Sequence, residues 1–127
     1  MIPLFPIKIA ILPEEILPLH IFEDRYKRMI SKSISSKEPF GIIYKNQGQI
    51  SNIGCAAYVH KIINEYDDGK YDILDKGQYR FEMLKSFKKE NLWHGTIKVI
   101  DEKYEYMDKK IFAQILDKYL QVLLSYN

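Results

Sequence analysis

The chain has 127 residues, which is enough for one domain with a hydrophobic core and too few for two. Hydrophobic residues make up 46% and charged residues 28%, the balance of an ordinary soluble domain. The net charge is only +2 and lysine outnumbers arginine sixteen to three, so the composition argues against sequence-specific nucleic-acid binding and against strong attraction to anionic membranes.

The single cysteine, Cys55, excludes an internal disulfide and a multi-cysteine zinc site, and it fits a reducing, cytoplasmic setting. No run approaches the roughly 18 apolar residues of a membrane-spanning helix. Pro3, Pro6 and Lys8 interrupt the apolar N-terminus, which no basic region precedes, so we expect no signal peptide.

The first predicted strand covers residues 7–12, where isoleucine alternates with other residues until Pro13. Residues 17–22 follow as an extended segment, because Pro18 keeps the preceding residue out of the α region. Both elements lead toward a helix.

The helix is predicted from Phe22 or Glu23 to about Ser35. Glu23 and Asp24 put negative charge in its first turn, which the helix dipole favours. Its apolar face has helical spacing and consists of Tyr26, Met29, Ile30 and Ile34.

A series of strands follows the helix. Short apolar or alternating runs predict strands at residues 40–44, 53–66, 71–75, 79–83 and 93–99, with turns at 46–49, 67–70 and 88–91. Asp68-Gly69 supplies the positive φ angles of a hairpin turn. Gly54 is a possible bulge site, and Gly77 is expected to bend its strand.

The periodicity becomes helical again near the C-terminus. We expect a barrel domain at residues 1–105 and a C-terminal helix at 106–127. The apolar face of this helix consists of Ile111, Phe112, Ile115, Leu116, Tyr119, Leu120, Leu123 and Leu124. The face can pack on the barrel or pair with a second copy in a homodimer. The order of elements predicts an α+β fold built on a twisted, partly closed antiparallel barrel.

Few residues suggest catalysis or metal binding. Cys55 and His60 could form a nucleophile and its base, but their odd separation on one strand puts them on opposite faces unless a bulge intervenes. His20 and Glu23 could be two metal ligands, although no third ligand is visible at suitable spacing. We therefore expect no catalytic, metal or cofactor site, and we expect His20, Glu23 and Arg25 to fix the strand-to-helix corner.

The remaining polar candidates also have simple structural explanations. Asp67 and Asp68 are adjacent turn residues, and His94 is expected to be a half-exposed strand residue. A basic and aromatic neighbourhood is the one exception, because it could bind RNA by stacking and charge; it consists of Lys85, Lys88, Lys89, Tyr79, Phe87 and Trp93.

The segment from Leu17 to Tyr26, LPLHIFEDRY, together with Leu4-Phe5-Pro6 and Met29, closely resembles the N-terminal, substrate-recognition domain of Lon proteases. The later segments 40–43, 54–63 and 75–81 are similar as well, so that the resemblance covers roughly residues 2–102. Asp24 stands where the family usually has proline and Glu14 where it usually has glycine, which affects the local turns.

The resemblance implies a PUA-like pseudo-barrel with one inserted helix, and a function in recognising unfolded or exposed apolar polypeptide segments, in connection with a protease or a chaperone. Lon proteases also carry an ATPase with a glycine-rich phosphate loop and a serine–lysine peptidase. The six glycines here never approach the phosphate-loop spacing, so we expect a free-standing, non-catalytic module. The alternatives are a PUA-like RNA-binding module and a regulatory domain that binds one folded partner.

Overall fold

Six strands and one helix make up the computed structural model, which describes residues 1–100 and residues 114, 117 and 118. In chain order they are β1 (Ile2–Ile7), β2 (Ile16–Ile21), α1 (Asp24–Ser36), β3 (Phe40–Asn46), β4 (Gln49–Glu65), β5 (Tyr71–Lys89) and β6 (Leu92–Val99). The predicted helix at 106–127 lies outside the described residues except at those last three positions.

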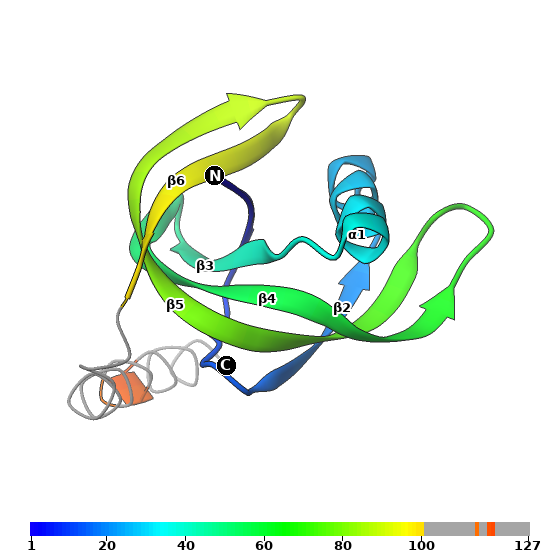
Figure 1. The fold of residues 1–127 in the computed structure, drawn as a ribbon, viewed down its shortest axis with the longest axis horizontal. Helices are drawn as coiled ribbons and strands as arrows, with labels where there is room; N and C mark the ends of the chain where they lie inside the picture. Colours follow the sequence, from blue (N-terminus) through cyan, green and yellow to red (C-terminus); the bar gives the residue numbers. More distant parts are fainter. Residues whose placement is uncertain (101–113, 115–116, 119–127) are drawn as a thin grey trace.

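The strands form one sheet in the order β2-β5-β4-β3-β1-β6, which closes into a barrel because β6 also pairs with β5. Figure 1 shows how β5 curves across the whole molecule. Its first half pairs with β2 and its second half with β6, while β4 runs along its other side. Strand β5 thus pairs with three other strands, and its pairing with β6 closes the sheet.

The pairing corrects two predictions. The first strand is Ile2–Ile7 rather than residues 7–12, because β1 pairs with β3 from Leu4 to Ile7, and residues 8–15 form a loop instead. The β1–β3 pair is parallel, so the barrel is mixed rather than wholly antiparallel. The parallel pairing follows from the long crossover through β2 and α1, since parallel neighbours cannot be joined by a tight hairpin.

The predicted hairpins are present, although in the β4–β5 turn only Gly69 has positive φ, at 88°, and Asp68 does not. Gln47 and Gly48 both have positive φ in the β3–β4 turn, and Glu90 and Asn91 do so in the β5–β6 turn, as tight two-residue turns require. Residues 71–75 and 79–83 belong to one strand, β5, and the β4–β5 register shifts between Ala56 and Ala57, beside Gly77. The bend predicted at Gly77 thus coincides with a bulge within one continuous strand.

Helix α1 lies against the barrel as the sequence predicts. Met29, Ile30 and Ser33 are its buried residues, and Ser33 donates a hydrogen bond to the carbonyl of Glu38 over 2.5 Å. Lys37 ends the helix in the left-handed conformation at φ 57°.

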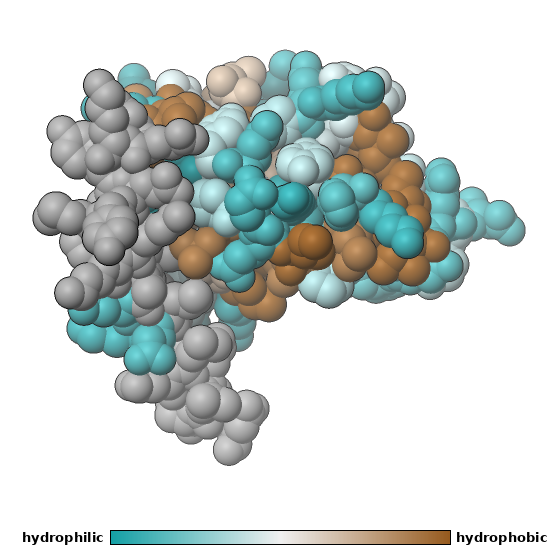
Figure 2. Space-filling model, turned by 60° about the horizontal axis from the view of Figure 1, so that its bottom comes forward, coloured by the Kyte–Doolittle hydropathy of each residue, from teal (hydrophilic) through white to brown (hydrophobic). Residues whose placement is uncertain are grey.

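Hydrophobic side chains also remain at the surface. Figure 2 shows them in patches among hydrophilic side chains on the face that is brought forward. The most exposed include Phe22 and Leu84, at 57% and 56%, and Ile63 at 50%. Such patches are candidates for contact with other molecules.

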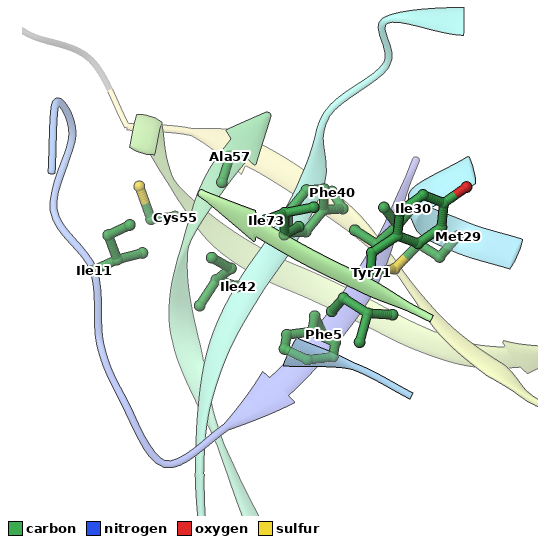
Figure 3. Packing of buried hydrophobic residues seen from close by; sticks show 11 residues of the cluster. Phe5, Ile11, Met29, Ile30, Phe40, Ile42, Cys55, Ala57, Tyr71 and Ile73 are labelled. Carbon is green, nitrogen blue, oxygen red and sulfur yellow. The ribbon is translucent and has the colours of Figure 1, made fainter. Parts of the chain in front are cut away.

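The core lies inside the barrel and under α1. Figure 3 shows Phe5, Tyr71 and Met29 close to one another at one end, with Cys55 and Ile11 at the other. A second cluster surrounds Phe81, whose ring lies so close to Gly54 that a Cβ there would be 2.6 Å from Cζ. The β3–β4 register also shifts between the pairs Ile43–Gly54 and Lys45–Ile50, so an irregularity begins at Gly54 as predicted, and the same glycine allows close packing against the ring.

Candidate functional site

The corner between β2 and α1 is fixed by polar contacts on its surface. Glu23 is the N-cap residue, with extended backbone and no side-chain cap bond. Its carboxylate accepts hydrogen bonds from Arg25, with Nε at 3.0 Å and Nη2 at 2.9 Å. Two of the residues expected to fix the corner, Arg25 and Glu23, therefore pair with each other beside the start of the helix.

A cavity of about 450 Å³ opens at this corner, and we name it the β2–α1 pocket. Its walls come from β1, from the end of β2, from the start of α1, from the β3–β4 hairpin and from β6. The lining residues are Phe5, Pro6, Ile7, Leu19, His20, Ile21, Phe22, Glu23, Arg25, Tyr26, Lys45, Ile50 and Trp93. The volume lies in the range of ligand-binding pockets.

Aromatic rings dominate the apolar part of the β2–α1 pocket. Phe5 and Tyr26 meet edge to face with ring centroids 4.5 Å apart, and the guanidinium of Arg25 lies 4.8 Å from the Tyr26 centroid. Burial raises the pKa of the Tyr26 hydroxyl above its usual value, against an opposing effect of the nearby Arg25 charge. Phe22 and Trp93 remain 57% and 37% exposed, so apolar ring surface is available to a ligand.

His20 joins the pocket to a hydrogen-bonded group centred on Asp72. The carboxylate of Asp72 accepts hydrogen bonds from Tyr66 Oη and His20 Nδ1, each at 2.5 Å, and from Asn64 Nδ2 at 3.2 Å. These donors, Tyr66 foremost, lower the pKa of Asp72 to about 2. The same bond to Asp72 raises the pKa of the Tyr66 hydroxyl. The group ties β2 to the β4–β5 hairpin.

The structure does not bring the predicted chemical candidates together. Cys55 is buried inside the barrel, where desolvation raises the pKa of its thiol to about 12, whereas His60 is exposed on β4. His20 binds Asp72 and Glu23 binds Arg25, so these two do not form a metal site. No group of three or more potential metal ligands occurs in the described part of the chain.

The turn residue Asp68 accepts the backbone N–H of Lys70 over 3.1 Å, a bond that lowers the pKa of its carboxyl. The carbonyl of Asp68 also accepts a hydrogen bond from Lys27 Nζ at 2.9 Å, so the turn is anchored to α1. His94 stacks on Phe87 with ring centroids 5.4 Å apart, and it is half-buried as predicted.

The sequence analysis missed one buried acid. The side chain of Asp75 is fully buried, and neither carboxylate oxygen has a hydrogen-bond partner in the described structure. Desolvation raises the pKa of this carboxyl to about 7. The available signal was its position, because Asp75 takes an inward place in the alternation that buries Tyr71 and Ile73.

Comparison with known protein families identifies the family of this chain. A family model described as the ATP-dependent protease La (LON) substrate-binding domain matches residues 1–126. The chain belongs to the Lon substrate-binding domain family. The predicted family membership is thereby confirmed over nearly the whole length of the chain.

Two solved structures of the family have the same fold. The crystal structure of a Lon N-terminal domain protein from Xanthomonas campestris is similar at a TM-score of 0.71 and 24% identity, over 79% of this chain and 59% of its own. The N-terminal domain of the Mycobacterium avium complex Lon protease gives 0.63 at 11% identity, over 94% and 74%. This chain thus spans less than two thirds of the Xanthomonas chain.

At these identities the likeness extends to the fold: a sheet-rich domain with one inserted helix. No curated protein matches the chain. In the part of the chain that the structure describes, no helix combines the length and the apolar character that a membrane crossing needs. The PUA-like description and the division at residue 105 stay predictions.

Proposed function

We propose that this member of the Lon substrate-binding family is a non-catalytic module that recognises unfolded or exposed apolar segments of polypeptides. The observation that carries the proposal is the β2–α1 pocket, which is lined by the exposed rings of Phe22 and Trp93 and by the more buried rings of Phe5 and Tyr26. Large rigid aromatic surfaces dominate the energetics of protein recognition.

The pocket accepts a bulky apolar side chain, and its polar residues orient the chain that carries it. Glu23, Arg25, His20 and Lys45 also line the pocket. Their polar groups can bind main-chain or polar groups on either side of an inserted side chain, as the few polar groups of a binding pocket commonly do. The module either delivers its ligand to a protease or holds it alone.

The chain contains a single tryptophan, which lines this pocket, so binding can be followed directly. Reduced and alkylated lactalbumin, a permanently unfolded polypeptide, is titrated into the protein at low and moderate salt. We expect a blue shift of Trp93 emission and saturable binding that survives moderate salt. Binding without any change in Trp93 emission would move the ligand away from the pocket.

A matched pair of variants tests the assignment. Phe22 and Leu84 are 57% and 56% exposed, and only Phe22 lines the pocket. Phe22→Ser should weaken binding by about tenfold, whereas Leu84→Ser should leave it unchanged. Equal affinities of the two variants would contradict the pocket assignment.

RNA binding is the second candidate. A cleft of about 250 Å³ between α1 and the β5–β6 hairpin is lined by Arg25, Arg28, Lys32 and Lys89. Glu38 and Glu90 line the same cleft, which weakens its attraction for a polyanion. Binding of a single-stranded RNA with steep salt dependence, and a loss of that binding when the charges of Lys88 and Lys89 are reversed, would favour this function.

If the protein binds neither the unfolded polypeptide nor the RNA, a regulatory role with one specific folded partner is favoured instead.

A further inference from the structure

The second half of β4 has a free edge in the described structure. Strand β3 accompanies β4 only as far as the pair Phe40–Ala57, whereas β5 continues beside it to the pair Glu65–Tyr71. Residues 58–65 therefore have β5 on one side and no described strand on the other. A free edge exposes backbone N–H and C=O groups that can pair with another chain.

This edge lacks proline, one of the common protections of edge strands, although Lys61 and two register shifts lie within it. The exposed edge strand β2 contains Pro18, which blocks a ladder bond, but residues 58–65 contain no proline. Ile62 and Ile63 are 38% and 50% exposed there. The β4–β5 register shifts between Val59 and Lys61 and again between Ile62 and Asn64, so β4 carries two bulges within this edge.

Helix α1 provides a wall along this edge. A cavity of about 540 Å³, which we name the α1–β4 groove, is lined on one side by Ser33, Ile34, Lys37 and Pro39, and on the other by β4 from Tyr58 to Ile62, with Gln78 from β5. Figure 1 shows α1 above the part of the sheet where β4 continues toward the β4–β5 hairpin. A strand edge beside a helix is the arrangement in which extended peptides are bound by strand addition.

The charges that line the groove define its ligand further. Lys37 and Lys61 carry the formal charges among the lining residues, and none of the described residues that line the groove is acidic. Ile34, Val59 and Ile62 supply apolar surface between them. The groove therefore complements an extended chain that alternates apolar with acidic side chains.

We infer that an extended polypeptide segment with alternating apolar and acidic side chains adds as a strand to β4 along residues 58–65. The ligand class rests on the proposed function, but the surface is separate from the β2–α1 pocket. Main-chain hydrogen bonds supply the affinity, and the groove selects the side chains. Because α1 forms the second wall, the groove suits a single chain rather than the edge of a second folded copy.

The test uses a short synthetic peptide of alternating valine and glutamate, and the same peptide with alternate amides N-methylated in either register. Backbone amide exchange, measured by NMR, should slow by about tenfold within residues 58–65 when the unmodified peptide saturates the protein. At least one N-methylated peptide should lose about tenfold in affinity, because its amides cannot donate to the edge. Lys37→Glu and Lys61→Glu should each weaken binding severalfold, with exposed Lys98→Glu as the control.

Three results would overturn the inference: equal binding of all the peptides, protection confined to residues 19–26, or edge pairing between two copies detected as a dimer by sedimentation. Phe22→Ser separates the two proposals. If this variant loses lactalbumin but keeps the valine–glutamate peptide and its amide protection, both surfaces act independently. If Phe22→Ser leaves lactalbumin binding intact while residues 58–65 are protected, the pocket assignment fails and the strand-addition site stands.

Discussion

Asp72 Oδ1 accepts a hydrogen bond from His20 Nδ1 at 2.5 Å, although 52 residues separate the two in the sequence. The bond joins the end of β2 to the start of β5, next to the β2–α1 pocket. Any change that loosens this pair should therefore be felt both in stability and at the pocket.

Acid should weaken this connection. The folded pKa of Asp72, about 2, lies below the ordinary value of 3.8, so the ionised carboxylate favours the folded state. Its contribution is fully present above pH 4 and is lost as the pH falls toward 2. We expect Asp72→Asn to lower Tm by only a few degrees at pH 7, because the carboxylate is only partly buried, and to reduce the loss of stability between pH 4 and 2. Thermal unfolding followed by circular dichroism over that range checks this, and identical acid profiles would contradict it.

Asp75 should give the opposite pH dependence. Its folded pKa of about 7 lies above 3.8, so the protonated form favours folding, and this contribution is present below pH 4 and lost as the pH rises through 7. This rise in the pKa of Asp75 corresponds to a decrease on the order of 4 kcal/mol in the free energy of unfolding between pH 4 and 7. Asp75→Asn should remove most of that slope in urea unfolding at a series of pH values. The exposed turn variant Asp67→Asn serves as the control, and a slope unchanged in Asp75→Asn would refute the prediction.

Gly77→Ala should destabilise the barrel strongly. A Cβ at Gly77 would lie 2.3 Å from the carbonyl oxygen of Leu12 and 3.2 Å from Cys55 Sγ. The loop over residues 8–15 would have to move, breaking the bonds that Gly77 makes with Glu14 and Glu15. We expect a loss of about 2–4 kcal/mol in urea unfolding. Gly48→Asn, at φ +80° with no atom within 4 Å, should cost far less.

Cys55 should be chemically inert in the folded protein. Burial raises the pKa of its thiol to about 12, so almost no thiolate is present at pH 8. Iodoacetamide should label the urea-unfolded chain within minutes and the native chain far more slowly, as mass spectrometry can measure. Rapid labelling of the native protein would contradict this prediction and make Cys55 a candidate nucleophile again.

The sequence predicts the local features of this fold better than the distant ones. The start of α1 was predictable because Pro18, Glu23 and Asp24 act within a few residues. Strand β1 was not, since Pro3 and Pro6 disfavour a strand locally while pairing with β3 stabilises one. The His20–Asp72 bond and the unpaired carboxylate of Asp75 depend on a register that no local pattern specifies.

The pairing of the strands also has a consequence for synthesis on the ribosome. Ile2 pairs with Gly95 and Ile16 with Lys76, so the apolar strands made first have no complete set of neighbours until almost the entire barrel has been translated. Helix α1 can form early, but it has no finished surface to cover. The nascent chain therefore resembles, for most of its synthesis, the unfolded polypeptides that we propose as its ligands.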